Sequence, residues 1–300
     1  MTITYRRGTL EDSYTVFQIF QQSIMELGER MGVMTISGGD DPEVLDKLWK
    51  ARQSLFEHLA QTAHEYWLAE RDGRAIGYAR AILRDGVQEL TEFFVLPGEQ
   101  SAGVGRELLG RTLTQSGTNL RSIIATLDER ALIHYLKLGL SGRFPIKYFS
   151  RAPEPVTVES DLEMRPIAPD LRELEDLNRI DQVVIGHLRP ADHRWLVSDR
   201  QGFTYTRAGE IVGYGYVGSS SGPFAVLNSH DIAAVLSHAE RFAAGKFKQF
   251  GVEIPLTNRA AIDYFLSRRY HMDAFTALFM SDRPFGRFEN YMFFGPPLMM

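Results

Sequence analysis

The fold of the first half of this 300-residue chain is decided by the stretch Val95-Leu-Pro97-Gly-Glu-Gln100-Ser-Ala-Gly103-Val-Gly105-Arg106-Glu-Leu-Leu109. The pattern predicts a strand that ends before Pro97, a glycine-containing turn, and a helix that begins inside the turn. The free N–H groups at such a helix start, with the helix dipole behind them, form a site for phosphate oxygens. Gly103 and Gly105 would let the backbone approach a ligand closely. A strand-to-helix turn without a ligand is the alternative interpretation.

Alternating and helical hydrophobic periods around this stretch predict a regular series of elements. In chain order we expect a strand at 3–7, a helix after the turn at 8–12, a helix over 42–63, strands at 65–70, 75–83 and 89–95, the helix that starts at 104, a strand at 122–127 and a helix over 131–138. The expected fold class is α+β, a mixed sheet with flanking helices.

The strand, V-x-P, Q-x-x-G-x-G and helix pattern resembles the acyl-CoA pyrophosphate loop of the GNAT N-acetyltransferase superfamily. The later segment Asp128-Glu-Arg-Ala131-Leu-Ile-His-Tyr135-Leu-Lys137-Leu-Gly139-Leu140 resembles the N-x-x-A-x-x-L-Y-x-K-x-G-F helix of the same family. Ala131, Tyr135, Lys137 and Gly139 match that helix, whereas Asp128, His134 and Leu140 depart from it. The resemblance covers residues 3–150, in the family's order of elements.

The resemblance implies that acetyl-CoA, as co-substrate, lies where two central strands part, near 89–95 and 123–127. Its pantetheine would pair with the backbone around Phe94 and Val95, and its pyrophosphate would lie on the amides of 101–106. The implied cofactor-binding residues are therefore Phe94, Val95, Gln100, Ser101, Ala102, Gly103, Val104, Gly105 and Arg106.

The same resemblance implies that an acceptor amine attacks the thioester directly, and that Tyr135 protonates the departing thiolate. A core aromatic residue is the alternative reading of Tyr135. Glu89 and Glu92 are the candidate general bases, and solvation at a sheet edge is the alternative for each. Strict alternation along the strand would place them on opposite faces, with Glu89 on the face of Val95.

Composition and charge exclude several classes of function. The net charge of −5 is dispersed, so bulk nucleic-acid binding is not expected. The chain has no cysteine, which excludes thiol nucleophiles and thiolate metal sites on it. No apolar run is long enough to span a bilayer, and no signal sequence is recognisable at the N-terminus, so we expect a cytoplasmic enzyme without a membrane partner or a metal.

The second half repeats the plan of the first. Arg71-Asp-Gly-Arg-Ala-Ile-Gly77-Tyr is echoed by Arg207-Ala-Gly-Glu-Ile-Val-Gly213-Tyr, at an offset of 213 − 77 = 136 residues. The Pro-rich segment 151–155 is the expected boundary, which gives an acetyl-CoA-binding GNAT domain at 1–150 and a GNAT-like domain at 156–300. In the second copy, Gln100, Gly103, Gly105 and Tyr135 are replaced by His230, Ala233, Val235 and Phe265. We therefore expect a degenerate copy that covers the substrate cleft or holds a homodimer, with CoA binding without glycines as the alternative.

Other patterns in the second half predict structure and not chemistry. The G-x-G-x-x-G of 213–218 has no helix after it and should lie in a strand and hairpin. Ser229-His230-Asp231 should cap a helix, and His187, Asp192 and His193 should lie in a polar loop. The aromatic segment 285–294 should be a final strand of the second sheet.

The expected activity is therefore acetyl transfer from acetyl-CoA to an amine of a small molecule or peptide, in a ternary complex. No motif identifies the acceptor. The acidic residues Asp40, Asp41 and Glu43 would suit a cationic acceptor, although surface solvation is the simpler interpretation. A non-catalytic acyl-CoA sensor and a scaffold that binds no CoA are the alternative functions.

Overall fold

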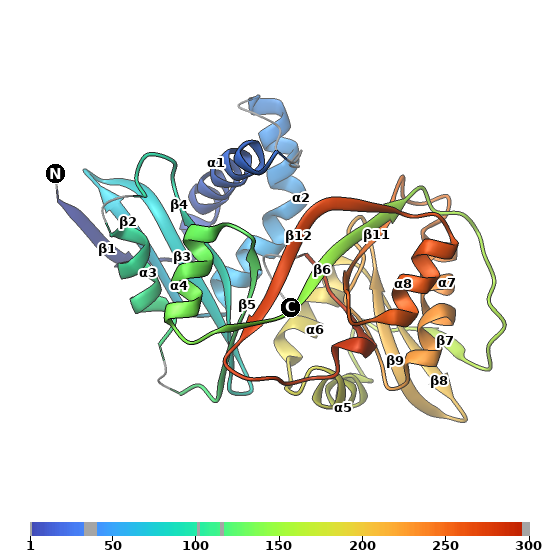
Figure 1. Cartoon of the computed structure of the whole chain (residues 1–300). Coiled ribbons are helices and arrows are strands. Elements are labelled where there is room, and N and C mark those ends of the chain that lie inside the picture. Colours follow the sequence, from blue (N-terminus) through green and yellow to red (C-terminus); the bar gives the residue numbers. More distant parts are fainter. Residues whose placement is uncertain (1, 33–40, 101–102, 115–116, 296–300) are drawn as a thin grey trace. The chain divides into compact units, whose positions relative to one another are not determined.

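The computed structural model describes residues 2–32, 41–100, 103–114 and 117–295 of the chain (Figure 1). Contacts within the chain separate two units. Unit 1 contains residues 1–123 and 128–139, and unit 2 contains residues 124–127 and 140–300.

Unit 1 is built on strands in the order β1-β2-β3-β4-β5, to which β5 contributes residues 120–123. The first four run antiparallel to their neighbours, and β5 runs parallel to β4. Their bounds are β1 Ile3–Arg7, β2 Ala63–Arg71, β3 Arg74–Arg84, β4 Val87–Val95 and β5 Leu120–Thr126. The helices are α1 Ser13–Met31, α2 Pro42–Gln61, α3 Val104–Thr112 and α4 Glu129–Lys137, so the elements appear in the order predicted from the sequence.

A β-bulge in β4 sets which side chains share a face of this sheet. Leu90 pairs with Ala81 and Glu92 pairs with Arg80, so Thr91 is an extra residue in β4. An extra residue reverses the alternation of side chains beyond it. Since Glu89 pairs with Ile82, two residues from Arg80 on β3, Glu89 and Glu92 lie on the same face. The prediction that Glu89 shares a face with Val95 is therefore wrong.

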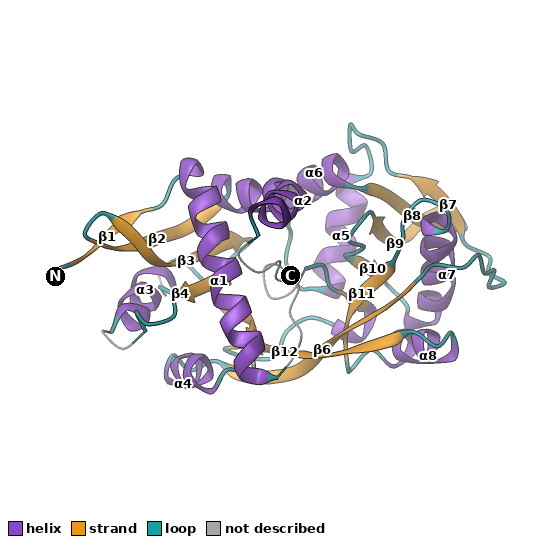
Figure 2. Ribbon diagram, turned by 90° about the horizontal axis from the view of Figure 1, so that it is seen from above, coloured by secondary structure: helices purple, strands orange, loops and turns teal. Residues whose placement is uncertain are grey.

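Helices lie on both faces of the unit 1 sheet (Figure 2). The rings of Phe20 on α1 and Phe94 on β4 lie 5.2 Å apart, so α1 and α2 cover the face that carries Glu92 and Phe94. Phe93 points to the opposite face, where its ring lies against Gly105 at the start of α3 and against Tyr135 on α4.

Unit 2 contains two groups of paired strands, β12-β6-β11 and β13-β10-β9-β8-β7. The strand bounds are β6 Ser141–Arg151, β7 Glu163–Pro166, β8 Gln201–Arg207, β9 Glu210–Val217, β10 Phe224–Val226, β11 Phe250–Pro255, β12 His271–Ser281 and β13 Tyr291–Met292. The helices of unit 2 are α5 Leu174–Val184, α6 Pro190–Asp199, α7 Ile232–Ala243 and α8 Arg259–Ser267, and short 3-10 turns lie at Ser229–Asp231 and Phe288–Asn290. A further 3-10 turn, Leu10–Asp12, lies in unit 1. From β7 to β12 the elements follow in the same order as from β1 to β6, as expected for two copies of one plan.

The structure assigns one strand differently from the repeat boundary in the sequence. Strand β6 ends the first copy along the chain, but it pairs with β11 on one side and with β12 on the other, so it belongs to unit 2. A segment without regular structure follows it from residue 152 to residue 162, where the boundary was expected.

Two predictions for the second half need correction. His193 lies on α6 and is fully buried, where its Nε2 lies 2.9 Å from Asp181 Oδ2, so it is part of a helix and not of a polar loop. Of the segment 285–294, only Tyr291 and Met292 form a strand, which pairs with β10. The G-x-G-x-x-G glycines lie in and just after β9, as predicted.

Candidate functional site

The start of α3 presents backbone amides that the helix itself cannot pair. Gly103 is the N-cap residue, with a left-handed φ of +76° that suits glycine, and it provides no side-chain cap. In the part of the chain that the structure describes, no side chain caps the N–H groups of the first helical turn, from Val104 to Arg106, which point out of the helix start. Val104 is buried and anchors the turn, whereas Arg106 is exposed. Ser101 and Ala102, predicted to contribute amides, lie outside the described residues.

Gly105 has a packing role that the sequence did not reveal. A Cβ atom there would lie 3.0 Å from the Phe93 ring, which is tighter than ordinary contact. The missing side chain therefore lets α3 lie close to β4, and this holds the helix start at the end of the strand.

Gln100 connects the loop to both neighbouring elements. Its Nε2 donates to the Val95 carbonyl at 3.1 Å, and its Oε1 accepts from Arg130 Nη1 at 2.6 Å. Gln100 thus ties the end of β4 to the first turn of α4. In this structure, the Gln100 side chain forms hydrogen bonds with protein groups and so holds the loop in place.

Strands β4 and β5 part beside this loop. Their parallel pairing covers Val87–Leu90 of β4 and ends where Leu90 meets Ile123. Past the bulge at Thr91, Phe94 and Val95 pair with Tyr78 and Gly77 of β3 on one side only. Among the described residues, no strand pairs with the other edge of β4 along these two residues, where the backbone contact with pantetheine was predicted.

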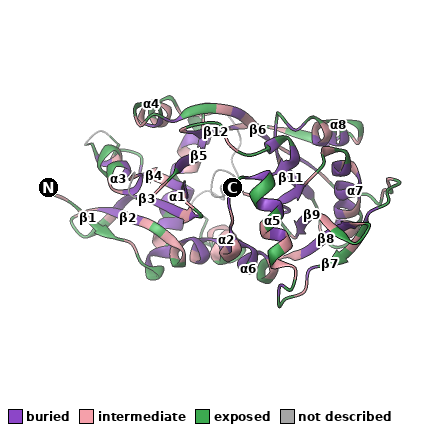
Figure 3. Ribbon diagram, turned by 90° about the horizontal axis from the view of Figure 1, so that it is seen from below, coloured by how far each residue is buried: buried purple, intermediate pink, exposed green. Residues whose placement is uncertain are grey.

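Tyr135 is the one buried residue of α4. The rest of the helix is partly or fully exposed (Figure 3). Its ring meets the Phe93 ring edge-on at 6.3 Å. Burial, with a smaller effect from the Asp128 charge, raises the pKa of Tyr135 above its ordinary value. The phenol therefore stays protonated at neutral pH and can act as a proton donor.

Glu92 forms a buried ion pair with Arg80, although it was predicted as a candidate base. Both side chains are fully buried, and Glu92 also accepts a hydrogen bond from the Tyr78 hydroxyl at 2.9 Å. Arg80 donates in addition to the Phe56 carbonyl of α2 at 3.0 Å. The carboxylate of Glu92 is thus committed to holding β3, β4 and α2 together. The pair was not predicted, because the bulge that brings its members opposite each other has no sequence signal.

Glu89, the other candidate base, is buried on β4 and pairs with Ile82 on one side and Ser122 on the other. It lies on the face covered by α1 and α2, where Phe94 also lies. The structure therefore brings Glu89 and Phe94 to one face, and Phe93 and Tyr135 to the other.

The corresponding gap in unit 2 contains the chain's own C-terminal strand. Tyr291 and Met292 of β13 pair with Ala225 and Phe224 of β10, and the Phe293 N–H donates to the Glu253 carbonyl of β11 at 2.8 Å. Strand β13 thus lies between β10 and β11, the counterparts of β4 and β5. Phe265, at the position of Tyr135, is fully buried among aromatic rings and has no proton to donate.

Residues 62–139 match the family model described as acetyltransferase (GNAT) domain. This segment runs from the start of β2 to the end of α4 and contains the loop, the open edge of β4 and Tyr135. Residues 62–139 therefore form a GNAT acetyltransferase domain.

Solved structures extend the GNAT likeness to both units. A candidate acetyltransferase from Pyrococcus horikoshii, 15% identical, superposes with a TM-score of 0.73 over 96% of this chain and 92% of its own. A tandem GNAT protein from the clavulanic acid biosynthesis pathway, 12% identical, has a TM-score of 0.59 and covers 95% of this chain and 100% of its own. A GCN5-related N-acetyltransferase from Sphaerobacter thermophilus, 13% identical, also has a TM-score of 0.59 and covers 94% and 96%. The fold is therefore that of a tandem GNAT protein.

No curated protein matches this sequence. Within the described residues, every helix is too short or too polar to cross a membrane.

Proposed function

We propose that this GNAT protein transfers an acetyl group from acetyl-CoA to an amine of a small molecule or peptide, by direct attack in a ternary complex. The observation that carries the proposal is the uncapped start of α3 beside the open edge of β4. Free amides with a helix dipole behind them suit the pyrophosphate, and the open edge suits an extended pantetheine.

In the proposed reaction, the amine nitrogen attacks the thioester carbon and the C–S bond breaks. The departing thiolate takes the proton of the Tyr135 hydroxyl, and the amine's surplus proton passes to a carboxylate directly or through water. The Tyr135 phenol is protonated at neutral pH before the C–S bond breaks, as the role of acid requires.

Glu89 is the proposed base because of its position on the sheet. Glu92 neutralises Arg80 in a buried pair, and removing it from that pair would leave a buried guanidinium without compensation. Glu89 is the next residue along β4 on the same face as Glu92. An acceptor that approaches Phe94 from the side of α1 and α2 would meet it there.

We propose that unit 1 alone binds acetyl-CoA. In unit 2 the backbone of β13 already makes, against Phe224 and Ala225, the strand contact that pantetheine is proposed to make against Phe94 and Val95. The loss of the loop glycines supports the same conclusion.

The proposal is tested by measuring CoA release with a thiol reagent while a panel of amines is screened. Because the chain contains no cysteine, the protein adds no thiol signal to this assay. Tyr135→Phe is expected to lower kcat by about 10²–10⁴-fold while the acetyl-CoA Kd stays unchanged. Tyr5→Phe, which removes a hydroxyl from strand β1, is the control.

Two results would contradict this function. If the wild type binds acetyl-CoA but releases no CoA with any amine, the protein is a sensor and not an enzyme. If Tyr135→Phe keeps the wild-type kcat, Tyr135 is a core aromatic residue and the proton must come from elsewhere.

A further inference from the structure

Helix α2 carries a charged residue in the middle of its apolar stripe. The stripe consists of Leu45, Leu48, Trp49, Leu55, Phe56 and Leu59, which recur at helical spacing. Arg52 occupies the position between Trp49 and Phe56 that the same spacing assigns to the core. Its side chain is only partly exposed.

The Arg52 guanidinium lies against the aromatic residues beside the open edge of β4. Its Cζ is 5.2 Å from the centre of the Phe20 ring, a cation–π distance. The Phe20 ring in turn meets the Phe94 ring edge-on, with 5.2 Å between ring centres. The Phe20 ring therefore contacts both Arg52 and Phe94, the residue along which acetyl-CoA is proposed to extend on β4.

Arg52 differs from other arginines of unit 1 in its partners. Arg80 pairs with Glu92, Arg6 pairs with Asp12 and Glu70, and Arg30 pairs with Asp128. Among the described residues, no carboxylate forms an ion pair with Arg52 and no acceptor hydrogen-bonds to it. Burial lowers the pKa of Arg52 below its ordinary value, and no neighbouring negative charge opposes this effect. A packed cation without a counter-ion costs stability, and groups whose pKa is perturbed in this way cluster at functional sites.

We propose that Arg52 binds an oxyanion of the acceptor, so that the acceptor is a small molecule that carries both an amine and a carboxylate or phosphate. A guanidinium binds either anion with two parallel hydrogen bonds. The inference rests on the acetyl transfer proposed above, and it deepens that proposal by naming the class of acceptor.

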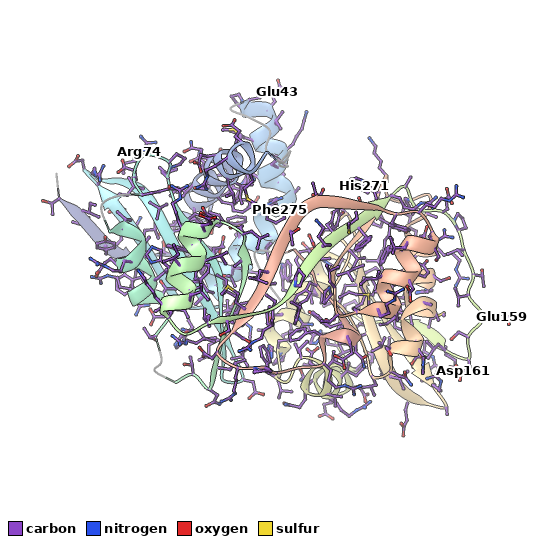
Figure 4. The ribbon with its side chains drawn as sticks, in the orientation of Figure 1. Glu43, Arg74, Glu159, Asp161, His271 and Phe275 are labelled. Carbon is purple, nitrogen blue, oxygen red and sulfur yellow. The ribbon has the colours of Figure 1, made fainter. Side chains whose placement is uncertain are left out.

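The acceptor face of unit 1 suits such a molecule. Glu89 and Arg52 lie on the same side of the sheet, one as the proposed partner of the amine and the other as the partner of the anion. The acidic residues that could have favoured a purely cationic acceptor lie at the start of α2 or outside the described residues. Asp41 accepts from the Glu43 N–H at 2.9 Å as the N-cap of α2, Glu43 is exposed at that end of the helix (Figure 4), and Asp40 lies outside the described residues.

The test compares amines in matched pairs with and without an anion. The probes are amino acids against their amides, and glucosamine 6-phosphate against glucosamine, each assayed for CoA release by the full-length protein. In the pair that carries the recognised anion, the anionic amine is expected to have a kcat/KM about 10- to 100-fold higher than that of its neutral counterpart. This is the effect of a hydrogen bond to a charged group. The two kinds of pair distinguish a carboxylate from a phosphate.

Variants of Arg52 connect this preference to one side chain. Arg52→Met is expected to abolish the preference for the anion, leave the acetyl-CoA Kd unchanged and raise Tm by a few degrees, because an uncompensated charge is removed. Arg52→Lys keeps the charge without the planar fork and should retain part of the preference. Arg74→Met, at the exposed turn between β2 and β3 (Figure 4), removes the same charge elsewhere and is the control.

The outcomes separate this inference from the proposed function. If acetyl-CoA does not bind, the proposed function is wrong. If acetyl transfer occurs but acids and neutral partners react equally, or if Arg52→Met keeps the preference, only the role of Arg52 is overturned. The same pairs are titrated calorimetrically into the CoA-saturated protein, so that the preference is measured for amines that are not acetylated. If no anionic probe reacts faster than its neutral partner and none binds more tightly, the inference is overturned.

Discussion

At the scale of single residues, the buried ion pair of Arg80 and Glu92 shows which features could be predicted from the sequence and which could not. The two residues are twelve positions apart, and each was visible as a charge in an apolar strand. Their pairing depends on the register of β3 and β4, which the extra residue Thr91 shifts by one. No pattern of hydrophobic residues predicts such a bulge, so strict alternation gave the wrong face for Glu89.

We expect the Arg80–Glu92 pair to be structural. Glu92→Leu alone should lower the free energy of unfolding by about 3–5 kcal/mol, because it leaves Arg80 buried without a counter-charge. The double variant Arg80→Met/Glu92→Leu should be more stable than Glu92→Leu. Urea unfolding of the two single variants and the double variant measures the coupling. Independent, additive effects would show that the pair contributes little.

Glu253 on β11 gives a prediction for pH. Burial, with the nearby charge of Asp273, raises the pKa of Glu253 to about 8 against the opposing effect of Lys147. The unfolded value is about 4.3, so the folded state favours the neutral carboxyl. Its contribution to stability is full below about pH 4 and is lost as pH rises through 8.

Replacing Glu253 should therefore help at high pH. Glu253→Gln is expected to raise the free energy of unfolding by roughly 1–3 kcal/mol at pH 9 and to change it little at pH 4. Thermal or urea unfolding at the two pH values measures the difference, with the exposed Glu43→Gln as control. A gain that is equal at both pH values would contradict the raised pKa.

At the scale of elements, the start of α3 could be predicted in detail, and the end of the chain could not. Gly103 and Pro97 are strong local signals, and they placed the strand, turn and helix correctly. The strand β13 is only two residues long, and its position between β10 and β11 depends on tertiary pairing with residues more than 30 positions away. Its aromatic composition predicted a strand but gave neither its length nor its role.

Gly103 should be required for acetyl-CoA binding because its left-handed backbone directs the amides of α3. Gly103→Ala is expected to raise the acetyl-CoA Kd roughly tenfold, as for one weakened hydrogen bond to a charged group. Gly73→Ala introduces the same kind of backbone strain at the β2–β3 turn, where a Cβ meets no atom within 4 Å. Calorimetry should find its Kd unchanged. Equal effects of the two variants would mean that strain, and not the loop, weakens binding.

At the scale of the whole molecule, the two copies share an order of elements but not a site. The repeat could be predicted because the Gly-Tyr strand and the α4-like helix recur at similar offsets. The assignment of β6 to unit 2 could not be predicted, since a strand's partners are not encoded in its own alternation. The copies also differ in what lies beside the central strand, an open edge on β4 in unit 1 and β13 against β10 in unit 2.

The central proposal is that this protein binds acetyl-CoA once per chain, at the start of α3. The measurement that tests it most directly is a calorimetric titration of the full-length protein with acetyl-CoA, read for stoichiometry and affinity. We expect one site per chain, with an affinity that Gly103→Ala weakens. Two sites per chain would contradict the occupied gap of unit 2, and no binding would contradict the claim itself.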